Sequence, residues 1–239
     1  MVTGASSGLG QRIARVLHGV GARVVVTARR MDRLQQLVAD LPDGVAIQAD
    51  LSTGADRERA VREALDACGR IDVLVNNAGI TVAAPVEEEE LEDFQSVLEV
   101  NAVAPWHLAK LCAPSMINNG GGSIINVASI LGMVGGTPIR QAGYCSSKGA
   151  VINLSRELAL QWARKGIRVN ALCPGWFPSE LTADMVADPS SQRFIARNSP
   201  IPRMGYEHEL DGAVLLLATD ASTFITGQTI VVDGGWTAR

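Results

Sequence analysis

Tyr144 and Lys148 stand four residues apart at the start of a segment whose apolar residues recur with helical spacing as far as Ala163. Side chains at that spacing lie on one face of a helix, one turn apart. A phenol ionises with a pKa of about 10 and is a poor acid or base near neutrality. A neighbouring ammonium favours the phenolate, so we expect Lys148 to lower the pKa of Tyr144. The pair predicts proton transfer in a carbonyl/alcohol interconversion, although a half-buried tyrosine beside a solvated lysine has the same spacing.

A glycine-rich turn near the N-terminus is a second candidate functional site. Gly4, Gly8 and Gly10 follow Val2 and precede a helical pattern over residues 13–20. Glycine permits a positive φ and close approach to the backbone, and a helix N-terminus presents free N–H groups to a pyrophosphate. The spacing is G-x-x-x-G-x-G rather than G-x-G-x-x-G. A tight turn is the alternative, but at the start of a strand–turn–helix unit the pattern favours dinucleotide binding.

The strand before this turn is short, since only Met1 and Val2 precede Thr3 and Gly4. Such strands normally hold about four to six residues. A sheet that lost most of its central strand would leave buried backbone groups unpaired. We therefore expect the first strand to be truncated here, with upstream residues missing from this numbering.

Strand and helix patterns alternate along the rest of the chain. Strand patterns lie at 23–27, 45–49, 71–75, 123–127, 168–172 and 229–232, and helical patterns lie at 31–41, 55–68, 87–116, 144–163 and 210–218. This alternation predicts an α/β fold with a parallel sheet and right-handed crossovers. The acidic run Glu87–Glu90 is interpreted as the solvated first turn of a helix. Neither a linker nor a repeat divides the chain, so we expect a single domain over residues 1–239.

Composition argues against several classes of protein. The net charge of −4 and pI near 5.4 argue against a nucleic-acid partner. No apolar run approaches the roughly 20 residues that cross a bilayer, and no signal peptide is visible, so we expect no membrane partner. The four cysteines are scattered and lack metal-ligand spacing. They predict reduced thiols in the cytoplasm and no metal site.

Several short motifs occur together and in order. They are Thr3-Gly4-x-x-x-Gly8-x-Gly10, Asn76-Asn77-Ala78-Gly79, Asn101, Ser129, Tyr144-x-x-x-Lys148 and Pro174-Gly175. With this set the chain resembles the short-chain dehydrogenase/reductase family over essentially its whole length. The resemblance implies a Rossmann-type doubly wound parallel sheet of seven strands in the order 3-2-1-4-5-6-7, with helices on both faces.

The resemblance also implies four catalytic roles. Tyr144 would be the general acid in reduction and the general base in oxidation. Lys148 would lower its pKa and hold the nicotinamide ribose. Ser129 would bind the substrate carbonyl and stabilise the developing alkoxide, where a capping serine is the alternative. Asn101 would interrupt its helix and hold a water molecule that links Lys148 to solvent.

The implied cofactor site gathers the glycine turn, several strand ends and the catalytic pair. Asp50 would meet the adenine amine, with a helix N-cap as the alternative, and residues 77–79 would line the adenine side. The full set is Gly4, Ser6, Ser7, Gly8, Leu9, Gly10, Arg29, Arg30, Asp50, Leu51, Asn77, Ala78, Gly79, Tyr144, Lys148, Pro174 and Gly175.

The end of the second strand bears on the choice of cofactor. An NAD site places a carboxylate there to accept from the ribose 2′-hydroxyl. Here the strand ends in Thr27-Ala28-Arg29-Arg30, without a carboxylate. An arginine fork suits a 2′-phosphate. We therefore expect NADP(H) to be preferred over NAD(H), with Arg29 as the main contact and Arg30 as the second, although two solvated arginines are the alternative.

The substrate side is expected between residues 176 and 205. Aromatic and apolar residues there would close over a small-molecule carbonyl or alcohol. Residues 176–182 resemble the corresponding loop of gluconate 5-dehydrogenase-like members. Residues 133–141 should form another wall, in which Arg140 either meets an anionic substrate or is simply exposed.

The sequence thus predicts an NADP(H)-dependent ketoreductase or alcohol dehydrogenase. A 3-oxoacyl-carrier-protein reductase is the first alternative, and a non-catalytic dinucleotide-binding sensor is a lesser one. The family resemblance implies a homotetramer, or a homodimer. The long helices around Asn101 and Tyr144, with little charge over residues 151–160, would suit burial against another subunit, and residues 231–236 would lie near a second interface.

Overall fold

A computed structural model of the chain describes residues 1–136 and 138–238. Seven parallel strands form one sheet in the order β3-β2-β1-β4-β5-β6-β7, which confirms the expected topology. The strands are β1 (Val2–Thr3), β2 (Val25–Ala28), β3 (Val45–Gln48), β4 (Val73–Asn76), β5 (Gly122–Val127), β6 (Ile167–Pro174) and β7 (Thr229–Val232). The short β1 pairs with both β2 and β4, so it occupies the centre of the sheet as expected.

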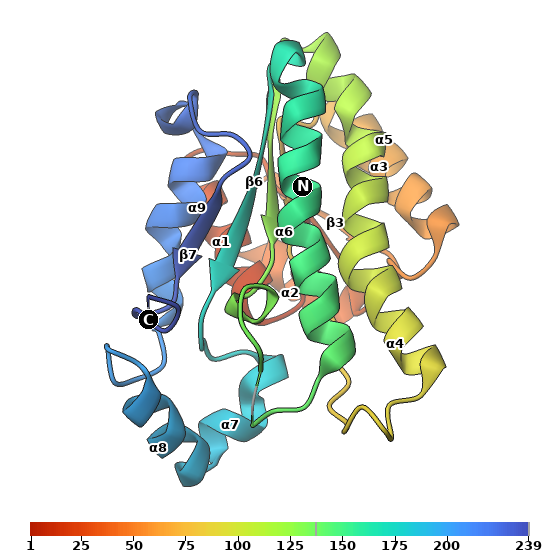
Figure 1. The fold of residues 1–239 in the computed structure, drawn as a ribbon. Helices are drawn as coiled ribbons and strands as arrows, with labels where there is room; N and C mark the ends of the chain where they lie inside the picture. Colours follow the sequence, from red (N-terminus) through yellow and green to blue (C-terminus); the bar gives the residue numbers. More distant parts are fainter. Residues whose placement is uncertain (137, 239) are drawn as a thin grey trace.

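Helices cover both faces of the sheet (Figure 1). On one face, α1 (Gly8–Gly19), α2 (Met31–Ala39) and α9 (Asp211–Ala218) pack on a core that includes Val26, Ile125 and Leu172. On the other, α3 (Gly54–Cys68), α5 (Ala104–Asn118) and α6 (Ala142–Trp162) pack on a separate core that includes Leu74 and Ile124. The consecutive residues Ile124 and Ile125 thus face opposite layers. Both faces are buried, which explains the apolar, β-branched strands.

The segment expected as one helix over 87–116 is divided. The structure has α4 (Leu91–Leu98), a π-helical segment (Glu99–Val103, η1) and then α5. The acidic run 87–90 precedes the first helix instead of forming its first turn, and Glu90 occupies the N-cap position. The expectation for this run was therefore wrong. Its side chains are largely exposed, so solvation stabilises it equally well outside a helix.

Beyond the carboxyl end of β6, the chain forms the segment η4 (Glu180–Thr182) and the helices α7 (Ala183–Ala187) and α8 (Pro189–Asn198). Figure 1 shows α7 and α8 below the tip of β6, apart from the two layers. The 176–205 region therefore lies beside the carboxyl ends of the strands.

Within residues 1–136 and 138–238, no helix combines the length and apolar character that a membrane span requires.

Candidate active site

A cavity of about 440 Å³ lies at the carboxyl ends of the parallel strands. This is the edge at which open α/β sheets bind their ligands. All the predicted cofactor residues except Gly10 line it, together with Ser129. Gly10 and Asn101 lie behind its wall. The structure thus brings together residues from positions 4 to 182 of the chain.

The glycine turn forms one wall of this cavity. Gly4 has φ +65°, and a Cβ there would lie 2.7 Å from the Cα of Ala78. Gly10 does not face the cavity, because a Cβ on it would lie 2.4 Å from the carbonyl oxygen of Gly4. It instead lets the first turn of α1 pack on the loop. The N-cap Ser7 makes no side-chain capping bond to the helix, so backbone N–H groups at this helix start can bind an anion.

The opposite wall carries the catalytic candidates. Tyr144 and Lys148 lie on the first turns of α6, as the spacing predicts. Ser129 follows β5 and hydrogen-bonds the phenol of Tyr144. Its Oγ also accepts from the backbone N–H of Leu131 at 3.1 Å, so the expected capping alternative holds as well. Lys148 Nζ donates to the carbonyl oxygen of Val127 at 2.8 Å.

The pKa of Tyr144 departs from the expectation. Burial raises it to about 12, while the hydrogen bond from Ser129 acts in the opposite direction. Burial also lowers the pKa of Lys148 to about 8. Loss of hydration penalises the charged form of each group. The expectation that Lys148 brings the pKa of Tyr144 below its ordinary value was therefore wrong for the cavity as it stands.

Asn101 sits inside the π-helical segment, where the interruption turns its side chain inward. Its Oδ1 accepts from the N–H of Ile80 at 2.8 Å, and its Nδ2 donates to the Ile80 carbonyl at 2.9 Å and to Ser147 Oγ at 3.0 Å. These bonds join α6 to the loop after β4. Single π turns are frequent at functional sites. Asn101 thus supports the wall on which Lys148 lies.

The side of the cavity that the sequence predicts to hold the adenine is built from two strand ends. Asn77 Nδ2 donates to the Thr3 carbonyl at 3.0 Å, which fastens the loop after β4 to β1. Asp50 lines the cavity, and its Oδ1 accepts from Ser52 N at 3.0 Å. Thr53, rather than Asp50, is the N-cap of α3. The N-cap alternative for Asp50 is therefore wrong.

The two arginines after β2 have different surroundings. Both line the cavity, but the guanidinium of Arg30 lies over the glycine turn and donates to Ser6 Oγ at 2.9 Å and to Ser7 Oγ at 3.1 Å. It also forms an ion pair with Glu180 at 2.7 Å. From the sequence, Glu180 is expected only as part of the substrate region at residues 176–205. A lone acidic residue in a variable loop gives no signal of its partner 150 positions away.

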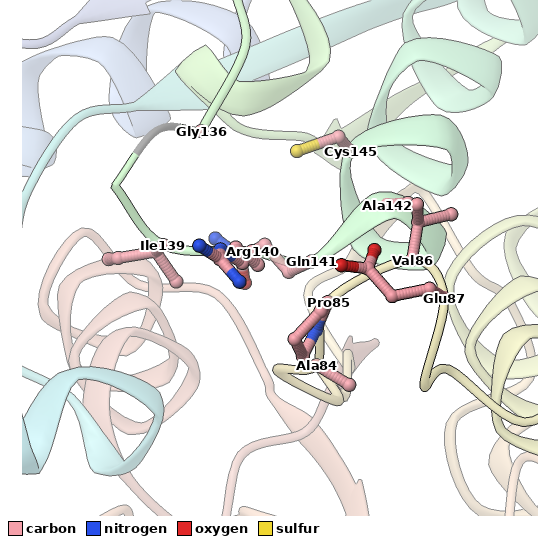
Figure 2. A pocket seen from close by; sticks show the side chains of 10 residues that line it. All are labelled: Ala84, Pro85, Val86, Glu87, Gly136, Ile139, Arg140, Gln141, Ala142 and Cys145. Atoms are coloured by element: carbon pink, nitrogen blue, oxygen red, sulfur yellow. The ribbon is translucent and has the colours of Figure 1, made fainter.

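A second cavity of about 350 Å³ lies between the loop after β4 and the segment before α6 (Figure 2). Arg140, Glu87 and Cys145 line it. Of the expected wall at 133–141, residues 136 and 139–141 border this second cavity, and no described residue of that range lines the main cavity. Thr137, within that wall, lies outside the described residues. Gln141 Oε1 accepts from Thr81 Oγ1 at 2.8 Å, and this bond joins the two segments.

Comparison with known proteins identifies relatives over nearly the full length. Residues 4–237 match a family model described as Enoyl-(Acyl carrier protein) reductase. A 3-oxoacyl-(acyl-carrier-protein) reductase of Synechocystis sp. is 36% identical, covering 98% of this chain and 95% of that protein. A gluconate 5-dehydrogenase of Gluconobacter oxydans is 35% identical, covering 99% and 93%.

A solved structure gives the same picture of the fold. The gluconate 5-dehydrogenase of Burkholderia cenocepacia, crystallised with NADP and tartrate, is 35% identical with a TM-score of 0.94. It covers 99% of this chain and 94% of its own.

Proposed function

The chain belongs to the short-chain dehydrogenase/reductase family and is an NAD(P)-dependent oxidoreductase of CH–OH and C=O groups, and we propose that it uses NADP(H) with Tyr144 as its acid and base. One observation carries the proposal. Ser129, Tyr144 and Lys148 line the same cavity as the glycine turn. A bound carbonyl and a bound dinucleotide would therefore meet in one space.

Tyr144, Ser129 and Lys148 have different roles in the reduction of a carbonyl. At neutral pH Tyr144 holds its proton, since burial raises its pKa, and it is ready to donate to a carbonyl oxygen. Ser129 donates to the same oxygen as negative charge develops there. Lys148, cationic at neutral pH, adds positive charge to that wall. When bound, the nicotinamide supplies a hydride to the carbonyl carbon or accepts it from the alcohol.

The preference for NADP(H) rests on the arginines after β2. A 2′-phosphate accepts charge-assisted hydrogen bonds from a guanidinium fork. Arg30 already faces the glycine turn, whereas Arg29 is exposed at the strand end. We therefore rank Arg30 before Arg29 as the phosphate contact. The NADP in the Burkholderia cenocepacia enzyme supports this choice.

A small hydroxy acid or polyol-derived ketone is favoured over an acyl carrier protein as the substrate. Arg140 lines the second cavity, but Glu87 lines it as well, so a carboxylate there would meet both charges. The acidic run 87–90 flanks the same cavity and would repel an acidic carrier protein. The gluconate 5-dehydrogenases among the relatives favour a hydroxy acid or polyol-derived ketone. Because another relative is a 3-oxoacyl-(acyl-carrier-protein) reductase, 3-oxoacyl thioesters are included in the test below.

A homotetramer, or a homodimer, in the cytoplasm is part of the proposal. Apolar side chains remain exposed on α5 and α6, including Trp106, Ile117 and Leu160. Such residues suit burial against a second copy. The four cysteines are free, which suits a reducing compartment. Light scattering after gel filtration measures the oligomeric state directly.

The decisive experiment follows oxidation of NADPH and NADH with a panel of ketones. The panel includes keto forms of sugar acids and 3-oxoacyl thioesters, and Tyr144→Phe is run alongside. We expect turnover with NADPH that falls at least about 100-fold in Tyr144→Phe. Tight NADPH binding without turnover on any ketone would favour the non-catalytic sensor instead. A preference for NADH would overturn the cofactor assignment alone.

A further inference from the structure

Two arginines of the α2 start converge on one carboxylate from the far end of the chain. Arg30 donates to Glu180 Oε1 at 2.8 Å and to Oε2 at 2.7 Å, a two-point fork. Arg33 NH1 contacts Glu180 Oε1 as well. Glu180 lies in η4, the segment that follows β6. The contact therefore joins the second strand end to the substrate region.

The carboxylate also reaches the glycine turn. Ser7 Oγ donates to Glu180 Oε2 at 2.9 Å, and Arg30 bridges to Ser6 Oγ at 2.9 Å. Two guanidinium groups and a hydroxyl thus surround one anion at the edge of the main cavity, which Glu180 lines. The hydrogen bonds from Arg30 lower the pKa of Glu180 to about 2, so it is ionised throughout the working range.

This donor set is what a phosphate monoester requires, namely two positively charged forks and a hydroxyl. Under the proposed function, the end of β2 beside the glycine turn is where the adenosine ribose carries its 2′ substituent. Glu180 therefore holds its carboxylate where the 2′-phosphate of NADP(H) would be bound. A 2′-hydroxyl, in contrast, brings no charge to this place.

We propose that Glu180 is a specificity-determining residue that competes with the 2′-phosphate for Arg30 and Arg33. The inference rests on the proposed use of the cavity by a nicotinamide dinucleotide. NADP(H) binds with displacement of Glu180 from the two arginines. NAD(H) leaves the ion pairs in place. Glu180 thereby weakens the affinity of the chain for NADP(H). Because it leaves the affinity for NAD(H) unchanged, it reduces the ratio by which NADP(H) is preferred over NAD(H).

The ion pairs of Glu180 are exposed enough for a phosphate to replace the carboxylate. The side chains of Glu180 and Arg30 are 49% and 39% exposed, and ion pairs at such positions contribute little net stability. A phosphate dianion brings more charge and three acceptor oxygens. It can therefore replace a single carboxylate at the same donors.

Calorimetric titration of NADP⁺ and NAD⁺ into the full chain tests the inference. Glu180→Gln keeps the shape and removes the charge. The matched control is Glu209→Gln, since Glu209 makes a similar fork with Arg203 away from the glycine turn. Thermal unfolding of each variant establishes that it is folded.

We expect Glu180→Gln to tighten NADP⁺ binding by about threefold to tenfold, the range expected for loss of one or two exposed ion pairs. NAD⁺ binding should change by less than about twofold, and Glu209→Gln should change neither. Equal changes for both dinucleotides, or weaker NADP⁺ binding in Glu180→Gln, would overturn the inference. The wild-type ratio of NADP⁺ to NAD⁺ affinity separately tests the proposed cofactor preference. If the wild-type chain bound neither dinucleotide, the proposed function and this inference would both fail.

Discussion

The ammonium of Lys148 lies 5.5 Å from the centroid of the Tyr144 ring, on the same face of α6. The two groups respond to burial in opposite directions, with the pKa of Tyr144 raised to about 12 and that of Lys148 lowered to about 8. Both therefore carry their proton at neutral pH. Lys148 does so at a cost, because a cation is held in a site that is only 4% exposed.

Replacing Lys148 should raise the stability of the fold while lowering the activity. A pKa lowered to about 8 corresponds to about 3 kcal/mol of destabilisation of the protonated form at neutral pH. Lys148→Met removes that cost but leaves the Val127 carbonyl without its donor, which offsets about 1–3 kcal/mol. The net gain is up to about 2 kcal/mol, so we expect the melting temperature at pH 7 to rise by up to about 8 °C while turnover falls at least about 100-fold.

The control for this variant is Lys165→Met, at an exposed position. It should change neither property. If Lys148→Met instead unfolded at a lower temperature, packing and the lost hydrogen bond would outweigh desolvation.

The same pair predicts how stability depends on pH. The folded chain releases the Lys148 proton near pH 8, whereas the ordinary pKa of a lysine is 10.5. Between these values the unfolded state binds more protons, so this residue makes stability rise with pH. Tyr144 does the reverse between the ordinary tyrosine pKa of 10.0 and about 12, because the folded chain keeps the proton to a higher pH.

Denaturant unfolding at several pH values measures both contributions. The stability of Lys148→Met relative to wild type should fall by about 3 kcal/mol from pH 8 to pH 10.5 and drop below that of wild type, since the neutral amine still donates to Val127. Tyr144→Phe should lack the decline above pH 10. A constant difference between wild type and Lys148→Met across the window would show that Lys148 is not perturbed by burial.

Much of the site could be predicted because its residues are tied to local patterns. The glycine turn, Ser129 and Pro174 each end a strand, and parallel strands bring their carboxyl ends to one edge. Tyr144 and Lys148 are related by helical spacing alone. These features need only the element order, which the alternation of patterns predicts.

Other features depend on distances that no local pattern carries. The pKa direction of Tyr144 was mispredicted because the spacing shows its neighbour but not its burial. The partnership of Arg30 with Glu180 depends on where the loop after β6 folds back. The break in the helix at residues 99–103 was inferred only from the resemblance to the family.

Gly132 illustrates a site requirement that the sequence does not signal. It ends the short 3₁₀ segment after Ser129, and a Cβ on it would lie 2.5 Å from the carbonyl carbon of Lys148 and 2.7 Å from its oxygen. Gly132→Ala should therefore push on the backbone of α6, destabilising the fold by about 1–3 kcal/mol. Displacement of Tyr144 and Lys148 should also lower turnover by at least about tenfold.

Gly135→Ala is the matched control, since a Cβ there meets nothing within 4 Å. It should change stability by less than about 0.5 kcal/mol. Steady-state kinetics and thermal unfolding distinguish the two variants. Equal behaviour of both variants would mean that the loop adjusts to the added methyl group and does not press on α6.

Thr3 fastens the loop after β4 to the centre of the sheet through its hydroxyl. Its Oγ1 accepts from the N–H groups of Asn77 at 2.9 Å and of Ala78 at 3.0 Å, and donates to the Val75 carbonyl at 3.3 Å. Thr3→Val keeps the shape and removes these bonds. Because the site is only 1% exposed, we expect a loss of about 1–3 kcal/mol in the free energy of unfolding.

Thr27→Val gives the comparison that isolates hydrogen bonding from packing. Thr27 is also buried in the adjacent strand, but within the described part of the chain its Oγ1 has no hydrogen-bond partner. Its replacement should leave stability unchanged or raise it by up to about 1 kcal/mol. Urea unfolding with an unchanged m-value measures both. Thr3→Val should in addition weaken NADP⁺ binding, because residues 77–79 line the cavity, whereas equal affinity in the two variants would show that the loop is held without Thr3.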